Sequence, residues 1–87
     1  MALVRLHGPL RKLAGDRLEH AVEAATVADG LRALEEAQPG LCGWVLDERG
    51  HLRRHLNVFV NGEQGRGDTP LGPGDVVDVL PAISGGR

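Results

Sequence analysis

One long amphipathic helix, with short alternating segments on both sides, is the feature that most constrains the fold of this chain. Thr26 opens the segment "TVADGLRALEEAQPG" and is a suitable N-cap residue. Val27, Leu31 and Leu34 follow at helical spacing, and the Pro-Gly pair at 39–40 ends the pattern. Because no other segment shows this spacing over a comparable length, the fold must be built around one main helix.

Alternating apolar and polar residues predict strands before and after that helix. In such segments every second side chain points to the same face, so one face can be buried and the other left open. The predicted strands span residues 2–7, 18–23, 56–61 and 76–81, with a weak strand around 63–66. Two strands, a helix and then two or three strands predict an α+β domain, in which the helix covers one face of a mixed sheet of four to five strands. A β-grasp (ubiquitin-like) arrangement fits this order.

The connecting segments are predicted to be irregular. Residues 8–16 should form a turn, because Gly-Pro and Gly-Asp pairs punctuate them. Residues 41–55 should be irregular too, with Trp44 and its apolar neighbours tucked against the core. Cys42 is the only cysteine, which excludes an internal disulfide. A persulfide-bearing role for Cys42 is an alternative, but we expect a small core residue.

Composition narrows the class of protein. A chain of 87 residues with 41% hydrophobic content suits one small globular domain, predicted at residues 1–81, followed by a flexible tail at 82–87. The formal net charge of −2 gives no reason to propose nucleic acid or an anionic membrane as partner. Without a signal peptide or a membrane-spanning run, a cytoplasmic location is expected.

Several motifs in order resemble the MoaD/ThiS family of ubiquitin-like sulfur carriers. The residues that carry the resemblance are "VFVNGE" and then "TPLGPGDVVDVLPAISGG", supported by "VRLHGPLRKLAG" and "TVADGLRALEEAQPGL". The resemblance covers nearly the whole chain. It implies a β-grasp fold and a working diglycine, here Gly85 and Gly86.

The resemblance also implies a reaction cycle. An E1-like enzyme uses ATP to adenylate the carboxylate of Gly86, and sulfide or an enzyme persulfide displaces AMP to form a thiocarboxylate. A sulfur-accepting synthase then uses that sulfur as a nucleophile, so the chain is a cosubstrate without a bound cofactor or metal site. Glycine suits this role, because a carboxylate needs activation and a backbone without Cβ can thread a narrow enzyme site.

Docking is expected on the open face of the sheet. If the valines of the last strands face the helix, Phe59, Leu80 and Leu3 lie on the opposite face and form an apolar docking patch. The family docks through that face, and Ile83 in the tail is a further candidate for partner contact. The alternative is that these are ordinary isolated apolar residues at a surface.

Arg87 departs from the family pattern. While Arg87 is attached, the carbonyl of Gly86 is locked in an amide and cannot be adenylated. We therefore expect a peptidase to remove Arg87, the alternative being an accidental feature of the chain end.

The destination of the sulfur stays open. The small subunit of molybdopterin synthase has about this layout, whereas "LRRHLNVFVNGE" with "LPAISGG" is more similar to carriers that serve cysteine biosynthesis. A ubiquitin-like modifier and a non-covalent binding module are the other classes. Arg49, Arg53, Arg54 and His55 could meet an acidic partner or simply form a solvated loop.

Overall fold

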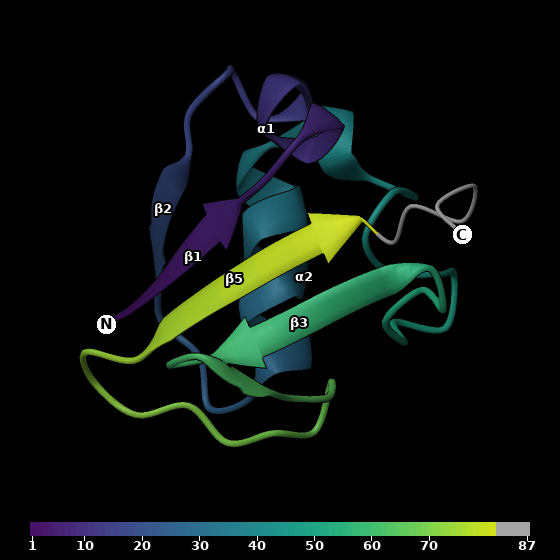
Figure 1. Cartoon of the computed structure of the whole chain (residues 1–87). Helices are drawn as coiled ribbons and strands as arrows, with labels where there is room; N and C mark the ends of the chain where they lie inside the picture. The colour runs from purple at the N-terminus through teal and green to yellow at the C-terminus, as the bar shows by residue number, and fades with distance from the viewer. Residues whose placement is uncertain (82–87) are drawn as a thin grey trace.

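The structure of the chain, a computed structural model, describes residues 1–81. Five strands form one mixed sheet in the order β2-β1-β5-β3-β4 (Figure 1). The neighbours β1 and β5 are parallel, and all other neighbouring strands are antiparallel. The strands are β1 (Ala2–Leu6), β2 (Glu19–Val22), β3 (Leu56–Val60), β4 (Glu63–Gln64) and β5 (Val76–Pro81). All five lie within segments that the sequence predicts as strands.

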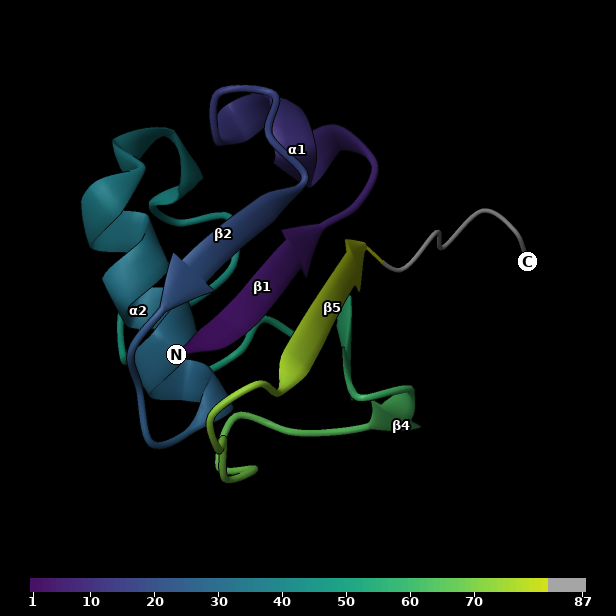
Figure 2. The ribbon, with the colours of Figure 1, turned by 90° about the vertical axis from the view of Figure 1, so that its left-hand side faces the viewer.

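The predicted main helix is α2 (Val27–Ala37), which covers one face of the sheet (Figure 2). The Oγ1 of Thr26 accepts a hydrogen bond from the backbone N–H of Asp29 at 3.2 Å, as expected of an N-cap. The helix ends at Gln38, directly before the short 3-10 helix η1 (Pro39–Leu41). Among residues 1–81 no helix covers the other face of the sheet, so the two faces have different surroundings.

The core between α2 and the sheet is aliphatic. The strand residues at alternate positions are buried, as the period-two pattern predicts, and the apolar stripe of α2 packs onto them. The largest fully buried side chains of the core are Val4, Leu6, Val27, Leu31, Leu41, Val45, Val58, Val77 and Val79. No helix among residues 1–81 is long and apolar enough to cross a membrane.

The prediction of a turn at residues 8–16 is wrong in part, because α1 (Pro9–Leu13) forms there. Gly8 adopts a positive φ of 62° and turns the chain out of β1, and Pro9 then supplies a suitable first helical residue. Leu10 and Ala14 are buried. The gain from burying these side chains explains why a short helix replaces a simple turn.

The segment after η1 corrects two further expectations. Leu41 and Val45 are buried as predicted, but Trp44 is 54% exposed and Cys42 is also exposed. Gly43 lies between them with φ 85°, a left-handed conformation that reverses the chain. Two turn hydrogen bonds, from Cys42 N to Pro39 O and from Trp44 N to Leu41 O, hold this reversal. The turn therefore points Cys42 and Trp44 away from the core that takes their neighbours.

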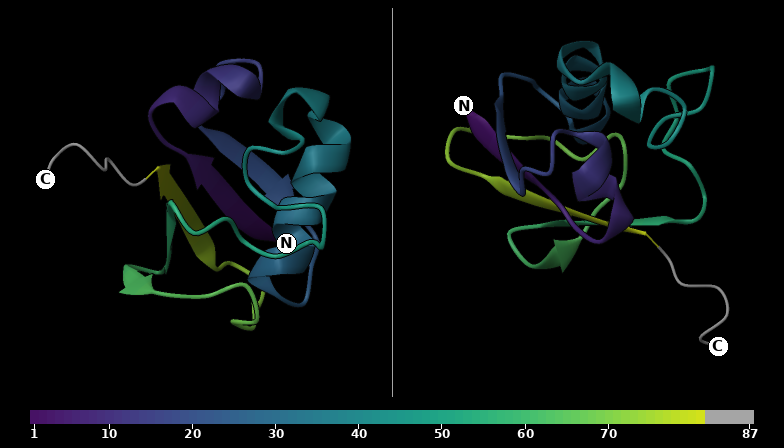
Figure 3. Two further views of the ribbon diagram at one scale, coloured as in Figure 1. Left: turned by 90° about the vertical axis from the view of Figure 1, so that its right-hand side faces the viewer. Right: turned by 90° about the horizontal axis from the view of Figure 1, so that it is seen from above.

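The rest of this segment runs beside α2 before it enters β3 (Figure 3, left). The carboxylate of Glu35 on α2 accepts a hydrogen bond from the backbone N–H of Leu46 at 3.1 Å. A β-bridge between Leu46 and Leu52 closes the loop that follows. The loop is thus attached to the helix rather than free in solvent.

Candidate functional site: the open face of the sheet

The open face is the side of the sheet opposite α2, formed by the residues between the buried positions of β1, β3 and β5. Their side chains are only half buried, in contrast to the alternating neighbours that face the helix. The open face of these three strands includes Leu3, Arg5, Asn57, Phe59, Val76, Asp78 and Leu80. This is the face on which docking was predicted.

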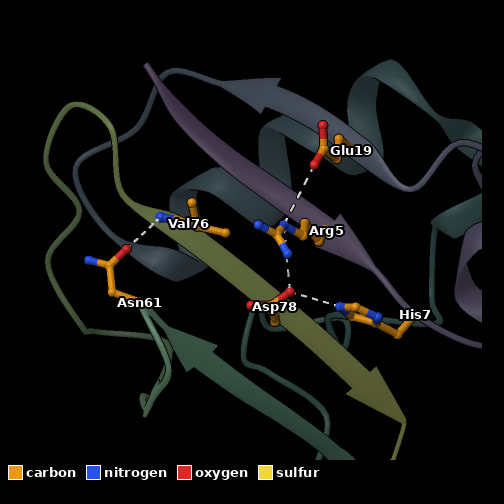
Figure 4. Close-up of polar contacts among 6 residues, drawn as sticks. All are labelled: Arg5, His7, Glu19, Asn61, Val76 and Asp78. Carbon is orange, nitrogen blue, oxygen red and sulfur yellow. Dashed lines mark hydrogen bonds and ion pairs between the residues drawn. The ribbon is translucent and has the colours of Figure 1, made fainter.

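A charged cluster occupies the middle of the open face. The Oδ1 of Asp78 lies 2.8 Å from Nε2 of His7 and 3.9 Å from Nε of Arg5, whose Nε is also 3.7 Å from Oε2 of Glu19 (Figure 4). Strand register brings these groups together, because Arg5 is paired with Glu19 on β2 and with Asp78 on β5. The centre of the face is therefore polar, a feature that cannot be read from the sequence without the strand pairing.

The predicted docking residues surround this cluster. Phe59 on β3 is opposite Asp78, and Leu80 lies two residues further along β5, opposite Asn57. This diagonal relation is within reach of an aromatic and a long aliphatic side chain. Leu3 is opposite Val76 at the other end of the face. Both Phe59 and Leu80 are half buried, and their role in docking stays a prediction.

A second polar network fixes the start of β5. The side chain of Asn61 accepts a hydrogen bond from Val76 N at 2.9 Å and donates one to Oδ1 of Asp75 at 3.0 Å. The backbone N–H of Gly72 donates to Oδ2 of Asp75 at 2.8 Å. The hydrogen bond from the backbone of Gly72 is the larger cause of the lowered pKa of Asp75, and the hydrogen bond from the side chain of Asn61 is the smaller one. The network joins the β3–β4 turn to the strand that leads toward the tail.

The strand β5 ends at Pro81, at the end of the sheet where α1 contacts β5 (Figure 1). Gly86 follows five residues later in the sequence. Ile83, Gly85, Gly86 and Arg87 lie outside the described residues, so their predicted roles stay predictions. Within residues 1–81 no three His, Cys, Asp or Glu side chains gather as candidate metal ligands.

Comparison with known proteins decides the family. The model of the ThiS family matches residues 4–86, which is nearly the whole chain. This chain belongs to the ThiS family. The match of this ThiS-family protein stops at Gly86, so the residue that departs from the predicted family pattern, Arg87, is also the residue that follows the matched range.

Individual relatives agree with this assignment. The chain is 37% identical over 84 residues to small archaeal modifier protein 1 of Haloferax volcanii, covering 94% of this chain and 97% of the relative. A chain of the BexX/CysO complex of Amycolatopsis orientalis has a TM-score of 0.85 at 26% identity, with 95% and 97% of the two chains covered.

A third relative has a different assigned function from the first two. A protein assigned as molybdopterin converting factor subunit 1, from Pyrococcus furiosus, has a TM-score of 0.75 at 28% identity, with 94% and 97% of the chains covered. These likenesses confirm the predicted β-grasp fold and the resemblance to ubiquitin-like sulfur carriers.

Proposed function

We propose that this protein is a sulfur carrier whose Gly86 carboxylate is converted to a thiocarboxylate. The observation that carries the proposal is the family match, which continues through the diglycine and ends at Gly86. In this proposal the folded domain is a handle that a partner recognises, and the chemistry takes place on the tail. The protein is then a cosubstrate, with no catalytic side chain or bound cofactor of its own.

The chemistry balances with ATP supplied through an E1-like activating enzyme. The Gly86 carboxylate attacks the α-phosphorus of ATP, which forms an acyl-adenylate and releases pyrophosphate. Sulfide displaces AMP and leaves a thiocarboxylate directly. Alternatively, an enzyme persulfide displaces AMP to form an acyl disulfide, and a second thiol then cleaves its S–S bond, which releases the thiocarboxylate and leaves a disulfide between the two thiols. Activation is needed because an ionised carboxylate is a poor electrophile at neutral pH.

This cycle requires that Gly86 become the end of the chain. The Gly86–Arg87 amide must first be hydrolysed, which assigns a peptidase as an additional partner. Glycine at positions 85 and 86 lets the backbone pass through a narrow enzyme site, whereas an arginine side chain would obstruct it.

Docking to the partners is assigned to the open face. Phe59 and Leu80 would supply apolar contact, and Ile83 would add contact closer to the reacting carboxylate. The charged cluster of Arg5, Asp78 and His7 would set the orientation, because paired charges favour a complementary partner over a wrong one.

The sulfur acceptor is assigned to a synthase that makes cysteine or another sulfur-containing metabolite. The similarity of "LRRHLNVFVNGE" and "LPAISGG" to the cysteine-type carriers supports this choice, and the likeness to a chain of the BexX/CysO complex supports action together with a partner protein. The alternative, a small subunit of molybdopterin synthase, is supported by the likeness to the Pyrococcus protein. The cytoplasm, where ATP is available, is the proposed location.

The decisive experiment compares a form that ends at Gly86 with the full chain that ends at Arg87. Each is incubated with the activating enzyme of the native host, ATP and a sulfur source, and intact masses are measured. The proposal expects one oxygen to be replaced by sulfur only in the form that ends at Gly86. An unchanged mass, with adenylate formation shown for a known substrate of the same enzyme, would refute it.

A second function, that of a protein modifier, has a specific observation in its favour. The relative with 37% identity is named a small archaeal modifier protein. Both functions begin with the same adenylate, but a modifier forms an isopeptide bond with a lysine amine. Lysine-linked conjugates that depend on Gly86, found in the experiment above with host proteins added, would favour the modifier.

A further inference from the structure

A cavity of about 720 Å³ lies on the helix side of the sheet, away from the open face, and arginines dominate its wall. Arginines from three separate parts of the chain converge there: α2, the loop before β3 and the loop after β4. They are Arg32, Arg49, Arg53, Arg54 and Arg66, together called the arginine pocket. A cavity of this size is in the range that holds small molecules rather than single ions.

The charge of the arginine pocket runs against that of the whole protein. The chain has a formal net charge of −2 and contains 10 Lys and Arg residues. The wall of the pocket includes five of those cations and one acid, Asp68, which gives a formal charge of +4 with His51 neutral. Such local concentration indicates an anionic ligand that carries several negative charges.

Three of these five cations form no ion pair within the described part of the chain, although the carboxylate of Asp47 attracts Arg53 at longer range. The Nη1 of Arg32 lies 3.4 Å from Oδ1 of Asp29. The Nε of Arg66 lies 3.9 Å from Oδ1 of Asp68. Across residues 1–81, the other three arginines form no ion pair. The Nε of Arg53 is also buried and has no hydrogen-bond partner there, a state that it shares with Nε of Arg5, which has carboxylates within 4 Å. An unmet buried donor is costly, so a ligand oxygen would remove a penalty as well as add an attraction.

The loop that supplies three of the arginines is held in shape by Asp47. Its Oδ1 accepts hydrogen bonds from the backbone N–H groups of Arg49 and His51, both at 2.9 Å. Gly50 has φ 81°, and a Cβ placed on it would lie 2.7 Å from Nη2 of Arg32. The loop backbone therefore packs directly against a guanidinium group from α2 and fixes one part of the wall.

The first turn of α2 also borders the pocket, but its backbone N–H groups are already used. Val27 N donates to Thr69 O, Ala28 N to Gly67 O and Asp29 N to Oγ1 of Thr26. The guanidinium groups are therefore the donors left for an anion. Their planar forks match phosphate oxygens two at a time, which a lysine cannot do. The floor includes Leu52 and Leu56, which favours a ligand with an organic part.

We propose that the arginine pocket binds a small molecule that carries two or more phosphate groups. The site lies on the helix side of the sheet, so it is independent of the open face and of the diglycine chemistry. Binding of an acidic protein segment is the competing possibility. The concave shape and the convergence of arginines from three segments favour a compact polyanion over an extended chain.

The test is a titration of the full chain with inorganic triphosphate at constant ionic strength. Binding is measured by calorimetry and by changes in the amide chemical shifts. We expect saturable one-to-one binding, with shift changes at residues 49–54 and 65–68, that chloride and sulfate at the same ionic strength do not reproduce. A parallel titration with a nucleoside triphosphate distinguishes an organic phosphate ester from a free polyphosphate, since only the former can use the apolar floor.

Substitutions locate the site. Arg53→Ala and, as a second variant at an exposed position, Arg54→Ala should each weaken binding by about tenfold, the effect of losing one charge-assisted hydrogen bond. Arg53→Lys should recover only part of the affinity, because it restores charge but not the fork. Arg17→Ala removes the same charge from an exposed position outside this cavity and should leave the affinity within about twofold.

Three results would overturn the proposal. One is the absence of saturable binding by either phosphate compound. Another is an equal loss of affinity in Arg17→Ala and Arg54→Ala, which would mean that only net charge matters. The third is tight binding of a hexaglutamate peptide with no binding of phosphates, which would assign the pocket to a protein partner. None of these results depends on whether Gly86 forms a thiocarboxylate.

Discussion

The open face and the arginine pocket both collect charged side chains, but they treat charge in opposite ways. On the open face, the carboxylate of Asp78 lies between Arg5 and His7, so the charges of Arg5 and Asp78 are paired within the fold even though Nε of Arg5 has no hydrogen bond there. In the arginine pocket, three of the five arginines form no ion pair within residues 1–81, and the cations outnumber the acids of the wall. The first arrangement lowers the electrostatic energy of the isolated domain. The second raises it, and binding of the proposed anion would remove this cost. Paired charge therefore serves the structure here, whereas the surplus of positive charge marks the proposed binding site.

The largest expected effect comes from breaking the paired cluster. Asp78→Ala removes the acceptor of His7 and leaves Arg5 with Glu19 alone, so we expect a loss of about 2 kcal/mol in the free energy of unfolding. Urea denaturation at neutral pH measures it. Asp68→Ala, which removes the acid of the pocket from a fully solvated pair, is the matched control and should change stability by less than about 0.5 kcal/mol. Equal losses in the two variants would erase the distinction between the regions.

The next effect concerns the backbone that shapes the pocket. Gly50→Ala forces a side chain into a left-handed conformation and should cost about 1–2 kcal/mol. Gly43→Ala has the same problem at φ 85° but meets no atom within 4 Å, so it reports the strain alone. We expect similar stability losses, with the side-chain NMR signal of Arg32 displaced only in the Gly50 variant. A displaced Arg32 signal in both variants would show that Gly50 has no special contact with the pocket wall.

The elements of the fold could be predicted because their signals are local. The capping residue Thr26, the helical stripe of α2 and the alternation of the strands each depend on residues a few positions apart. Local patterns also assign each strand residue to one face, so Phe59, Leu80 and Leu3 could be placed on the open face. Turn chemistry was less informative, since burial of Leu10 and Ala14 converted a predicted turn into α1.

The charged constellations could not be predicted because they depend on long-range pairing. His7 and Asp78 are 71 positions apart, and alternation does not reveal that β1 and β5 are neighbours or in which register. The arginine pocket likewise needs three segments to meet, although the sequence did show Arg49, Arg53 and Arg54 near one another. For Cys42 and Trp44 the missing information was the conformation of Gly43, which decides on which side of the chain its neighbours lie.

At low pH, the loop of the arginine pocket should lose its hydrogen bonds before the rest of the domain does. Hydrogen bonds from the backbone of His51, the largest cause, and of Arg49 lower the pKa of Asp47. A lowered pKa in the folded state means that the stabilisation is present above the ordinary value of about 4 and is lost as pH falls through the folded value. We expect the amide protons of Arg49 and His51 to lose their protection, measured against the intrinsic exchange rate at each pH, below that pH, and in Asp47→Ala already at neutral pH. The amides of β1 are the internal control, and simultaneous loss of protection in both regions would contradict a local event.

The smallest effect tests whether the pocket stores electrostatic repulsion. Arg54→Ala removes one of several neighbouring positive charges, so it should leave the protein equally stable or up to about 0.5 kcal/mol more stable at low salt. The difference from the unmodified protein should vanish as salt screens the remaining arginines. Arg17→Ala, at an exposed position outside the pocket, should show no gain under either condition. Thermal unfolding at two salt concentrations measures both variants. A destabilised Arg54→Ala protein at low salt would mean that the arginines are already compensated, and the contrast between the pocket and the open face would then be lost.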